Sequence, residues 1–405
     1  MQRPSEATVS KARAAQRRRY DAPVRIALVS TYDHPTRDSI ERMLTAAFPE
    51  YQIENFSVVE VLKRHRQWIA PNLWHVATEY GREIARRRLS LREGYFRTTY
   101  AFTHLHRAMQ GLIDPKRHAF SFQMQSLYDT SVPGVPHFIY TDHTHLSNLH
   151  YPDFDRSALR SPAWLALERT VYENATAVFT RSTDVAADLT RFYNIPPGKV
   201  ECVYAGSNVD VSHSGPPDNA GYSNQRILFV GVDWQRKGGP DLLEAFKEVL
   251  QRYPKAHLTI AGADVRVDLP NCTVLGRVSA QQLAQHYAQS SIFCLPTRHE
   301  PFGIAFVEAM MHRLPVVATR VGAIPDMVDD GGNGYLVGPG DPQALVQALC
   351  KLLADPAHCK ALGQRSYQKA TDLYTWPRTG QRIRARIMGV LAESERETGL
   401  GVAFQ

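Results

Sequence analysis

Apolar residues follow two alternating patterns along most of this chain. Short runs that are apolar throughout indicate parallel strands covered on both faces. In the first half of the chain such runs lie at 24–30, 137–141, 177–180 and near 200. Segments with apolar residues at helical spacing separate them, and they lie at 37–48, 57–69, 72–89, 162–174 and 183–193. Strands that alternate with helices predict a doubly wound α/β unit.

The same alternation begins again after a segment that lacks it. Residues 212–225 (SHSGPPDNAGYSNQ) are rich in turn-forming residues, which is typical of a linker. Beyond this segment, runs typical of strands lie at 227–230, 257–262, 273–276, 292–295, 316–318 and 335–337, with helices between them and up to about residue 373. We therefore predict two Rossmann-like domains, 23–211 and 226–374, that face each other across a cleft.

The most informative stretch is HEPFGIAFVEAM (299–310), which follows the expected strand 292–295. Glu300 lies in the loop after that strand, Gly303 opens a helix, and Glu308 lies within the helix. Free N–H groups at a helix N-terminus suit phosphate oxygens, and ionised carboxylates accept hydrogen bonds from pairs of hydroxyls. A nucleotide sugar offers hydroxyls, phosphates and hydroxyls in that order. A lone glutamate would more simply stabilise the helix, but the proline and the Phe-Gly pair between the two acids favour a binding site.

This stretch resembles the E-x7-E element of the retaining glycosyltransferases of family 4, which have the GT-B fold. The resemblance runs from about Ile227 to Trp376 and weakens towards the N-terminus. It implies that Glu300 contacts the donor sugar and that Glu308 holds the nucleotide ribose. It also implies that backbone amides between the two acids meet the sugar and the diphosphate; these amides belong to Phe302, Gly303 and Ile304.

The resemblance extends to the end of the chain. In the family a tryptophan precedes a last helix that crosses back to the first domain, and Trp376 occupies that place. Residues 375–405 are therefore expected to form such a helix. The alternative is a simple C-terminal helix on the second domain.

A basic turn follows the expected strand 227–230 in FVGVDWQRKGG (229–239). A diphosphate leaving group gains negative charge as the glycosidic bond breaks, so fixed cations near it lower the barrier. In family 4 an arginine usually follows the first glycine, and a lysine precedes the next one. Lys237 matches the lysine, but Val232 stands at the arginine position, and we expect Arg236 to replace it. The alternative for both basic residues is a solvated turn.

The expected strand 137–141 is followed by a loop with several histidines, DHTHLSNLHY (142–151). Asp142, His143 and His145 suit metal ligation, since Asp and His are common ligands. The resemblance implies instead that a histidine just after this strand faces the donor sugar, and His143 fits that place. We expect structural roles for His145 and His150, and no metal at the site.

The composition is that of a globular protein. Apolar residues make up 43% of the chain, and no apolar run approaches the roughly 20 residues that cross a bilayer. The five cysteines are scattered, which indicates buried thiols of a reducing compartment rather than disulfides or a zinc site. We therefore expect a cytoplasmic protein.

Positive charge is unevenly distributed. The net charge is +7, and residues 1–22 contain an excess of Lys and Arg that predicts a disordered, solvated tail. A second basic stretch, 63–107, leaves open a peripheral contact with an anionic membrane at the inner membrane surface. Nucleic acid is not expected as a partner, because the chain has no base-reading motif and the nearby aromatic residues are spaced like a helix core.

Together these features predict a retaining, metal-independent hexosyltransferase that uses a UDP- or GDP-linked sugar and no cofactor. The acceptor would be a hydroxyl of a glycan, a lipid-linked sugar or a small molecule. The chain offers cations, amides and sugar-holding carboxylates, but no evident acid/base pair at glycosidase spacing. Two alternatives remain open: a nucleotide-sugar epimerase of the same fold, and a non-catalytic nucleotide-sugar-binding protein.

Overall fold

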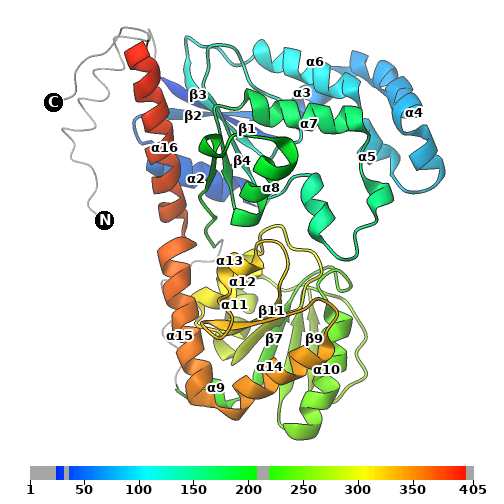
Figure 1. The fold of residues 1–405 in the computed structure, drawn as a ribbon, viewed down its shortest axis with the longest axis vertical. Coiled ribbons are helices and arrows are strands. Elements are labelled where there is room, and N and C mark those ends of the chain that lie inside the picture. The colour runs from blue at the N-terminus through cyan, green and yellow to red at the C-terminus, as the bar shows by residue number, and fades with distance from the viewer. Residues whose placement is uncertain (1–23, 32–35, 208–218, 398–405) are drawn as a thin grey trace, which may run out of the picture.

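The computed structural model describes residues 24–31, 36–207 and 219–397 of the 405-residue chain. The predicted tail, 1–22, and residues 212–218 of the predicted linker lie outside these ranges. Figure 1 shows two α/β domains, one above the other, joined along one side by the last two helices. None of the described helices combines the length and the apolar composition that crossing a bilayer requires.

The first domain contains a six-stranded parallel sheet in the order β2-β1-β3-β4-β5-β6. Both faces of this sheet are covered: Ile26 and Leu28 of its strand β1 lie in one apolar core, and Ala27 and Val29 lie in another. The strands are β1 (Arg25–Ser30), β2 (Gln52–Ser57), β3 (His118–Met124), β4 (His137–Thr141), β5 (Ala177–Thr180) and β6 (Val200–Cys202). The helices are α2 (Arg37–Ala47), α3 (Val58–Arg64), α4 (Ile69–Ala85), α5 (Leu91–Tyr95), α6 (Thr99–Gln110), α7 (Pro162–Asn174) and α8 (Thr183–Tyr193), with short 3-10 turns η1 (Arg66–Trp68), η2 (Leu146–His150), η3 (Arg156–Ala158) and η4 (Pro197–Lys199).

The second domain repeats this architecture with a six-stranded parallel sheet in the order β12-β11-β10-β7-β8-β9. Its strands are β7 (Arg226–Val230), β8 (His257–Ala261), β9 (Cys272–Gly276), β10 (Ile292–Leu295), β11 (Val316–Thr319) and β12 (Gly334–Val337). The remaining helices are α9 (Asn219–Ser223), α10 (Gly239–Arg252), α11 (Ala280–Gln289), α12 (Ile304–Met311), α13 (Ile324–Met327), α14 (Pro342–Ala354), α15 (Pro356–Leu373) and α16 (Trp376–Glu397). The predicted fold class, two Rossmann-like domains, is confirmed.

Two strands of the first sheet are not evident from the apolar pattern. β2 is an edge strand with the polar sequence QIENFS. β3 is buried along its whole length although it contains His118, Ser121 and Gln123. These polar groups have internal partners: Ser121 Oγ lies 2.7 Å from His137 Nδ1, and Gln123 Nε2 donates to the carbonyl of Tyr128 at 2.8 Å. Buried polar groups that form internal hydrogen bonds are tolerated in a strand. The sequence of β3 therefore lacks the apolar run that would predict a buried strand.

The end of the predicted linker belongs to the second domain. Residues 219–223 form α9, which packs against α15. The carbonyl of Gly221 accepts a hydrogen bond from Ser291 Oγ at 2.7 Å, and Tyr222 Oη donates to the carbonyl of Arg313 at 2.8 Å. The break in periodicity therefore includes a short helix that is anchored to the second domain.

The last two helices run along both domains, shown in orange and red on the left of Figure 1. α15 packs against α12 of the second domain, and α16 packs against α2 of the first. Arg384 of α16 donates to the carbonyl of Ala47 at 2.8 Å and to Glu50 at 2.6 Å. Where α16 begins, a Cβ on Gly206 would lie 2.4 Å from the backbone nitrogen of Trp376, so this approach requires glycine.

We expect Gly206→Ala to lower the free energy of unfolding by roughly 1–3 kcal/mol, the usual cost of forcing atoms into a packed contact. Gly389→Ala, in the helix α16 that begins at Trp376, is the control, because a Cβ there meets no atom within 4 Å. Alanine in a helix interior should leave that variant unchanged or more stable by about 0.5–1 kcal/mol. Denaturant titration of both variants measures the difference, and equal stabilities would show that the contact with Trp376 does not need glycine.

Candidate active site

The candidate site forms where the second sheet reverses its strand order. β7 and β10 are neighbours in the sheet, and the chain builds outwards in opposite directions from them, to β8 and β9 on one side and to β11 and β12 on the other. The loops that leave the carboxyl ends of two such strands diverge, which opens a crevice for a ligand. Lys237 lies in the loop after β7, and Glu300 lies in the loop after β10.

These two loops are fastened to each other. The backbone N–H of Arg298 donates to the carbonyl of Arg236 at 2.8 Å. Gly238 has a φ of +73°, and a Cβ on it would lie 1.8 Å from the carbonyl oxygen of Pro296, so only glycine permits this approach. Lys237 Nζ donates to Glu300 Oε2, and the two side chains are only 13% and 7% exposed. The structure thus brings together the predicted lysine and the first predicted carboxylate as a nearly buried ion pair.

Arg236 is also directed towards the Glu300 loop. Its Nη1 donates to the carbonyl of His299 at 2.8 Å, and its Nε lies 3.4 Å from Asp233 Oδ2. Val232, at the position where the family resemblance expects an arginine, has a side chain that is 62% exposed. A guanidinium is therefore present beside Lys237, and it approaches the cleft from a different position in the loop.

Glu308 lies in the second turn of α12 and is buried. Tyr287 Oη donates to its Oε2 at 3.2 Å, and burial raises the pKa of Glu308 to about 7. The Tyr287 ring stacks on His312 with ring centroids 5.0 Å apart, and His312 Nδ1 lies 2.8 Å from the carbonyl oxygen of Glu308. These contacts hold the carboxyl in one place while its charge remains easy to change near neutral pH.

The loop between the two carboxylates ends at Gly303, the N-cap of α12. Its φ is +97°, and a Cβ would lie 2.6 Å from the ring of Phe306 and 3.1 Å from Glu300 Cγ. Glycine therefore lets the first backbone N–H groups of α12 lie close to Glu300. The side chain of Phe302 is buried against the core, with its ring 6.3 Å from that of Tyr374. The backbone rather than the side chain of Phe302 is thus the part that can meet a ligand.

The first domain faces this site through the loop after β4. The His143 ring is half-buried and lies 5.5 Å from the His299 ring and 6.3 Å from the Tyr151 ring. Tyr151 stacks on His299 with centroids 3.8 Å apart, so these contacts cross between the domains. Burial lowers the pKa of His143, and burial with the neighbouring His143, Arg236 and Lys237 lowers the pKa of His299 to about 4. Both imidazoles are therefore neutral at pH 7.

A pocket of about 410 Å³ lies between the domains beside this ring stack. It is lined by Tyr151, Asp153, Phe154, Gln235, Arg236, Pro240, Arg298 and His299. Arg298 bridges the domains through Asp153 at 3.0 Å and Asp241 at 2.9 Å. The sequence patterns do not single out Tyr151, Asp153, Arg298 or His299. The only local signal is their place in the sequence. Arg298 and His299 directly precede Glu300, and Tyr151 and Asp153 lie at or just after the end of the loop that contains His143.

Profiles of two glycosyltransferase families match the chain. "Glycosyltransferase Family 4" matches residues 116–211, and "Glycosyl transferases group 1" matches residues 224–355. The chain belongs to the family-4 type of glycosyltransferases. The resemblance inferred from Glu300 and Glu308 is thereby confirmed.

Curated relatives match this chain over part of their length. A D-inositol 3-phosphate glycosyltransferase of Corynebacterium diphtheriae is 28% identical over 273 residues, which are 60% of this chain and 63% of that one. A GDP-mannose-dependent alpha-(1-6)-phosphatidylinositol monomannoside mannosyltransferase of Mycolicibacterium smegmatis is 31% identical over 38% of this chain and 45% of its own. The matches therefore span less than two thirds of these relatives.

Solved structures match the fold over nearly the whole chain. A sucrose-phosphate synthase from Thermosynechococcus elongatus superimposes with a TM-score of 0.66 at 18% identity, covering 91% of this chain and 100% of that one. HepE of Anabaena, solved with UDP and glucose, has a TM-score of 0.60 at 14% identity and covers 90% of this chain and 99% of its own. The arrangement of the two domains is thus that of GT-B proteins.

The residues considered as metal ligands in the first domain have separate partners. Asp142 forms an ion pair with Arg181 at 3.2 Å. His145 Nε2 accepts a hydrogen bond from the backbone N–H of Arg160 at 3.0 Å, and the backbone N–H of His145 donates to Glu168 Oε1 at 2.9 Å. His145 thus ties its loop to the domain core.

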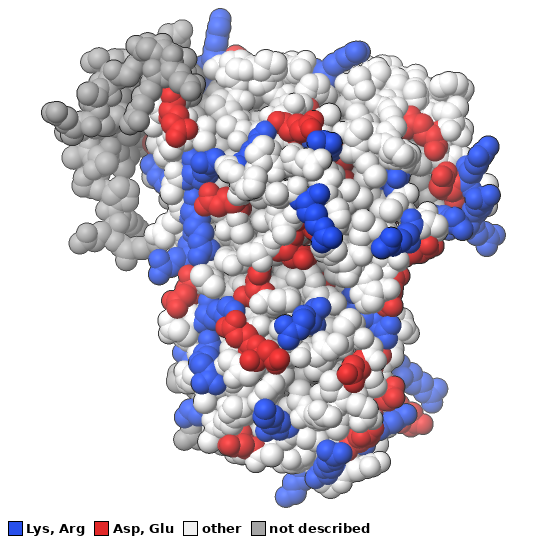
Figure 2. Space-filling model, viewed as in Figure 1, with Lys and Arg blue, Asp and Glu red and all other residues white. Residues whose placement is uncertain are grey.

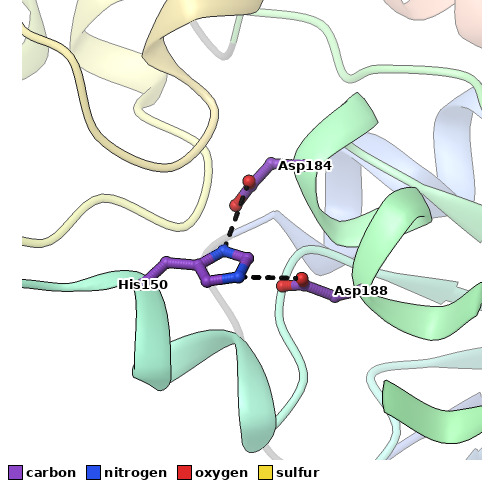
Figure 3. A group of neighbouring side chains, drawn as sticks. All are labelled: His150, Asp184 and Asp188. Carbon is purple, nitrogen blue, oxygen red and sulfur yellow. Dashed lines mark ion pairs between the residues drawn. The ribbon is translucent and has the colours of Figure 1, made fainter. Parts of the chain in front are cut away.

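Within the part of the chain that the structure describes, one group of three potential metal ligands is close together: His150, Asp184 and Asp188 (Figure 3). Their ligand atoms lie within 4.8 Å of one another. The imidazole lies between the two carboxylates, with Nδ1 3.5 Å from Asp184 and Nε2 3.4 Å from Asp188. A protonated His150 would satisfy both acids, and a divalent cation would suit the same set. His150 therefore links η2 to α8 rather than only capping its own loop.

Proposed function

We propose that the protein is a retaining glycosyltransferase that moves a sugar from a nucleoside-diphosphate sugar to an acceptor hydroxyl. The Lys237–Glu300 pair supports this proposal most directly, because a cation and a carboxylate lie together at the strand-order reversal of the second sheet. Family membership adds support. So do the relatives: one is named as GDP-mannose-dependent, and the structural neighbour HepE binds UDP and glucose.

In this proposal the second domain holds the donor. Glu308 accepts hydrogen bonds from the ribose hydroxyls, and the first N–H groups of α12 contact the diphosphate. Lys237 turns its ammonium group to the diphosphate when the donor enters, which frees the Glu300 carboxylate for the sugar hydroxyls. The Lys237–Glu300 ion pair compensates both charges, and in this proposal the donor replaces one partner of each.

The proposed chemistry needs no protein nucleophile. The acceptor oxygen attacks the anomeric carbon from the side that the diphosphate is leaving. The bond from that carbon to phosphate oxygen breaks, and the departing phosphate oxygen takes the acceptor proton. Lys237 and Arg236 stabilise the negative charge that gathers on the diphosphate. His143, neutral and placed across the cleft, accepts a hydrogen bond from the donor sugar and orients it.

We further propose that the reaction needs neither a metal nor a cofactor, because two cations and a helix N-terminus supply the countercharge for the diphosphate. The acceptor is a glycan, a lipid-linked sugar or a small molecule with a free hydroxyl. The pocket between the domains, next to the His143–His299 contact, has room for such a group.

A donor-only assay separates this function from its alternatives. The protein is incubated with UDP- and GDP-sugars, and the products are followed by NMR. A retaining transferase slowly hydrolyses its donor, and the first-formed sugar keeps the anomeric configuration of the donor. An epimerase releases an isomerised sugar, and a binding protein gives a saturable complex without turnover. An inverted first-formed anomer would disprove the retaining mechanism.

The ribose role of Glu308 predicts a pH-dependent affinity for nucleoside diphosphate. The pKa of about 7 means that the carboxylate form, the better acceptor, increases as the pH rises from 6 to 8. Affinity should rise by up to about tenfold over that range if the ionised form binds best. Glu308→Gln should weaken binding by about 1.5–3 kcal/mol and remove this share of the pH dependence. Calorimetry at pH 6 and pH 8 measures both effects. The pH dependence of binding that remains in Glu308→Gln is the share that comes from titration of the nucleotide itself.

Lys237→Ala should chiefly lower kcat, by about 10²-fold or more, because its charge matters most as the diphosphate departs. Arg236→Ala tests whether Arg236 replaces the arginine missing at position 232, and a smaller loss of kcat is expected. Val232→Arg, added to that variant, should restore part of the loss. Unchanged kcat in Arg236→Ala would mean that the diphosphate site works with Lys237 as its only side-chain cation.

Metal independence predicts that transfer survives EDTA. His143→Ala should then reduce kcat strongly while nucleoside diphosphate affinity stays nearly the same, since His143 faces the sugar from the other domain. Loss of transfer in EDTA with recovery on adding a divalent cation would refute the metal-independent mechanism. If Asp188→Asn abolished that recovery, the cation would be assigned to His150, Asp184 and Asp188.

A further inference from the structure

The outer side of the first domain exposes an unusual amount of apolar surface. Among the described residues, six large apolar side chains are exposed, and four of them belong to α4 and the start of α5. Their exposed fractions are 42% for Ile69, 42% for Leu73, 65% for Trp74 and 56% for Leu91. We call the region formed by these four side chains the α4 surface. Clustered exposed apolar residues mark an interaction site more often than scattered ones do.

The apolar face of α4 is separate from the face that packs on the domain. Asn72, Val76 and Tyr80 are buried, and α4 packs against α5 and α6. Leu73 and Trp74 project from the exposed side of the helix together with Ala70 and Ala77. The exposed side of the helix therefore has few charges along its length, although it faces water. Trp74 has the largest exposed fraction of all the large apolar residues described.

Basic residues flank this apolar face at both ends of α4. Between residues 58 and 110 the exposed basic side chains are Lys63, Arg64, Arg66, Arg82, Arg86, Arg87, Arg88, Arg92 and Arg107, whereas the exposed acidic ones are Glu60, Glu83 and Glu93. Figure 2 shows blue side chains gathered at the right edge of the upper domain, where α4 and α5 lie in Figure 1. The α4 surface is thus an apolar strip with positive borders.

We propose that the α4 surface docks the protein on a lipid bilayer that contains anionic lipids. Tryptophan and leucine side chains insert into the boundary between headgroups and acyl chains, while arginine and lysine remain at the level of the negative headgroups. A nucleic acid would be bound by the basic residues but would leave the apolar strip in water. The pairing of both features on one helix favours the bilayer. This inference does not depend on the proposed reaction.

Figure 1 places α4 and α5 on the side of the first domain opposite α16. A bilayer at the α4 surface therefore leaves the packing of α16 on α2 undisturbed. The residues of the α4 surface are also distinct from those that line the pocket between the domains. Docking can be removed by substitution without altering the candidate site.

The test is flotation of the full-length protein with vesicles at physiological salt. Wild-type protein should float with vesicles of equal parts phosphatidylcholine and phosphatidylglycerol, and not with phosphatidylcholine alone. Leu73→Ser combined with Trp74→Ser should weaken binding at least about tenfold through the loss of apolar insertion. Arg82→Gln, Arg86→Gln and Arg88→Gln together should weaken it by roughly 100-fold, since each basic residue near an anionic surface contributes about fivefold.

The matched control removes three exposed charges from the second domain, with Lys247→Gln, Arg252→Gln and Lys255→Gln. It should float like the wild type, and all variants should keep the wild-type melting temperature. Failure of the wild type to float with anionic vesicles would overturn the proposal, as would an equal loss in the control. Normal flotation of the Leu73/Trp74 variant would also overturn it, and would identify the region as a general polyanion-binding surface.

Discussion

The contact between the loop after β7 and the loop after β10 determines the geometry of the whole cleft. Two backbone features, the Arg298–Arg236 hydrogen bond and the glycine at 238 against Pro296, hold these loops together at the centre of the second sheet. Their approach brings the ammonium of Lys237 onto the carboxylate of Glu300. Two opposite charges that are this little exposed stabilise the site only as a pair, because either one alone would be buried without compensation. The proposed donor, with its diphosphate and its hydroxyls, would supply a new partner to each of these two charges.

The cleft combines fixed cations with neutral imidazoles. Arg236 and Lys237 lie close enough to lower the pKa of His299, and burial acts in the same direction on both His299 and His143. The positive charge is thus concentrated on the groups proposed to face the diphosphate. The imidazoles stay neutral, so each can accept a hydrogen bond. Glu308 differs, since its pKa near 7 makes its charge responsive to ligand and pH.

The two domains are joined by a small number of specific contacts. Tyr151 stacks on His299, Arg298 pairs with Asp153, and Thr183 donates its backbone N–H to Asp326 at 2.7 Å. α15 and α16 add a continuous connection along one side of the two domains, where α16 packs on α2. A relative movement of the domains would have to separate the Tyr151–His299 stack, because its two rings belong to different domains. Opening of the cleft and exposure of His143 are therefore expected to occur together.

Local pattern was sufficient for much of this protein. The apolar runs determine most strands of both sheets, and the spacing of Glu300, Gly303 and Glu308 determines a carboxylate, a helix start and a second carboxylate in order. Lys237 is likewise recognisable from the turn that contains it. These features depend on residues close together in the chain, so the sequence by itself carries them. The same holds for the family to which the chain belongs.

Other features were decided only by the tertiary structure. β3 is not predicted by the apolar pattern, because it contains a buried serine and a buried glutamine. Their hydrogen-bond partners lie on a neighbouring strand and in a loop that only the fold brings close. The stack of Tyr151 on His299 and the bridge from Arg298 to Asp153 join residues about 150 positions apart. The contact of Gly206 with Trp376 is similar in kind. The contacts between the domains depend on how the two domains approach each other, and the apolar pattern along the chain contains no information on that distance or orientation.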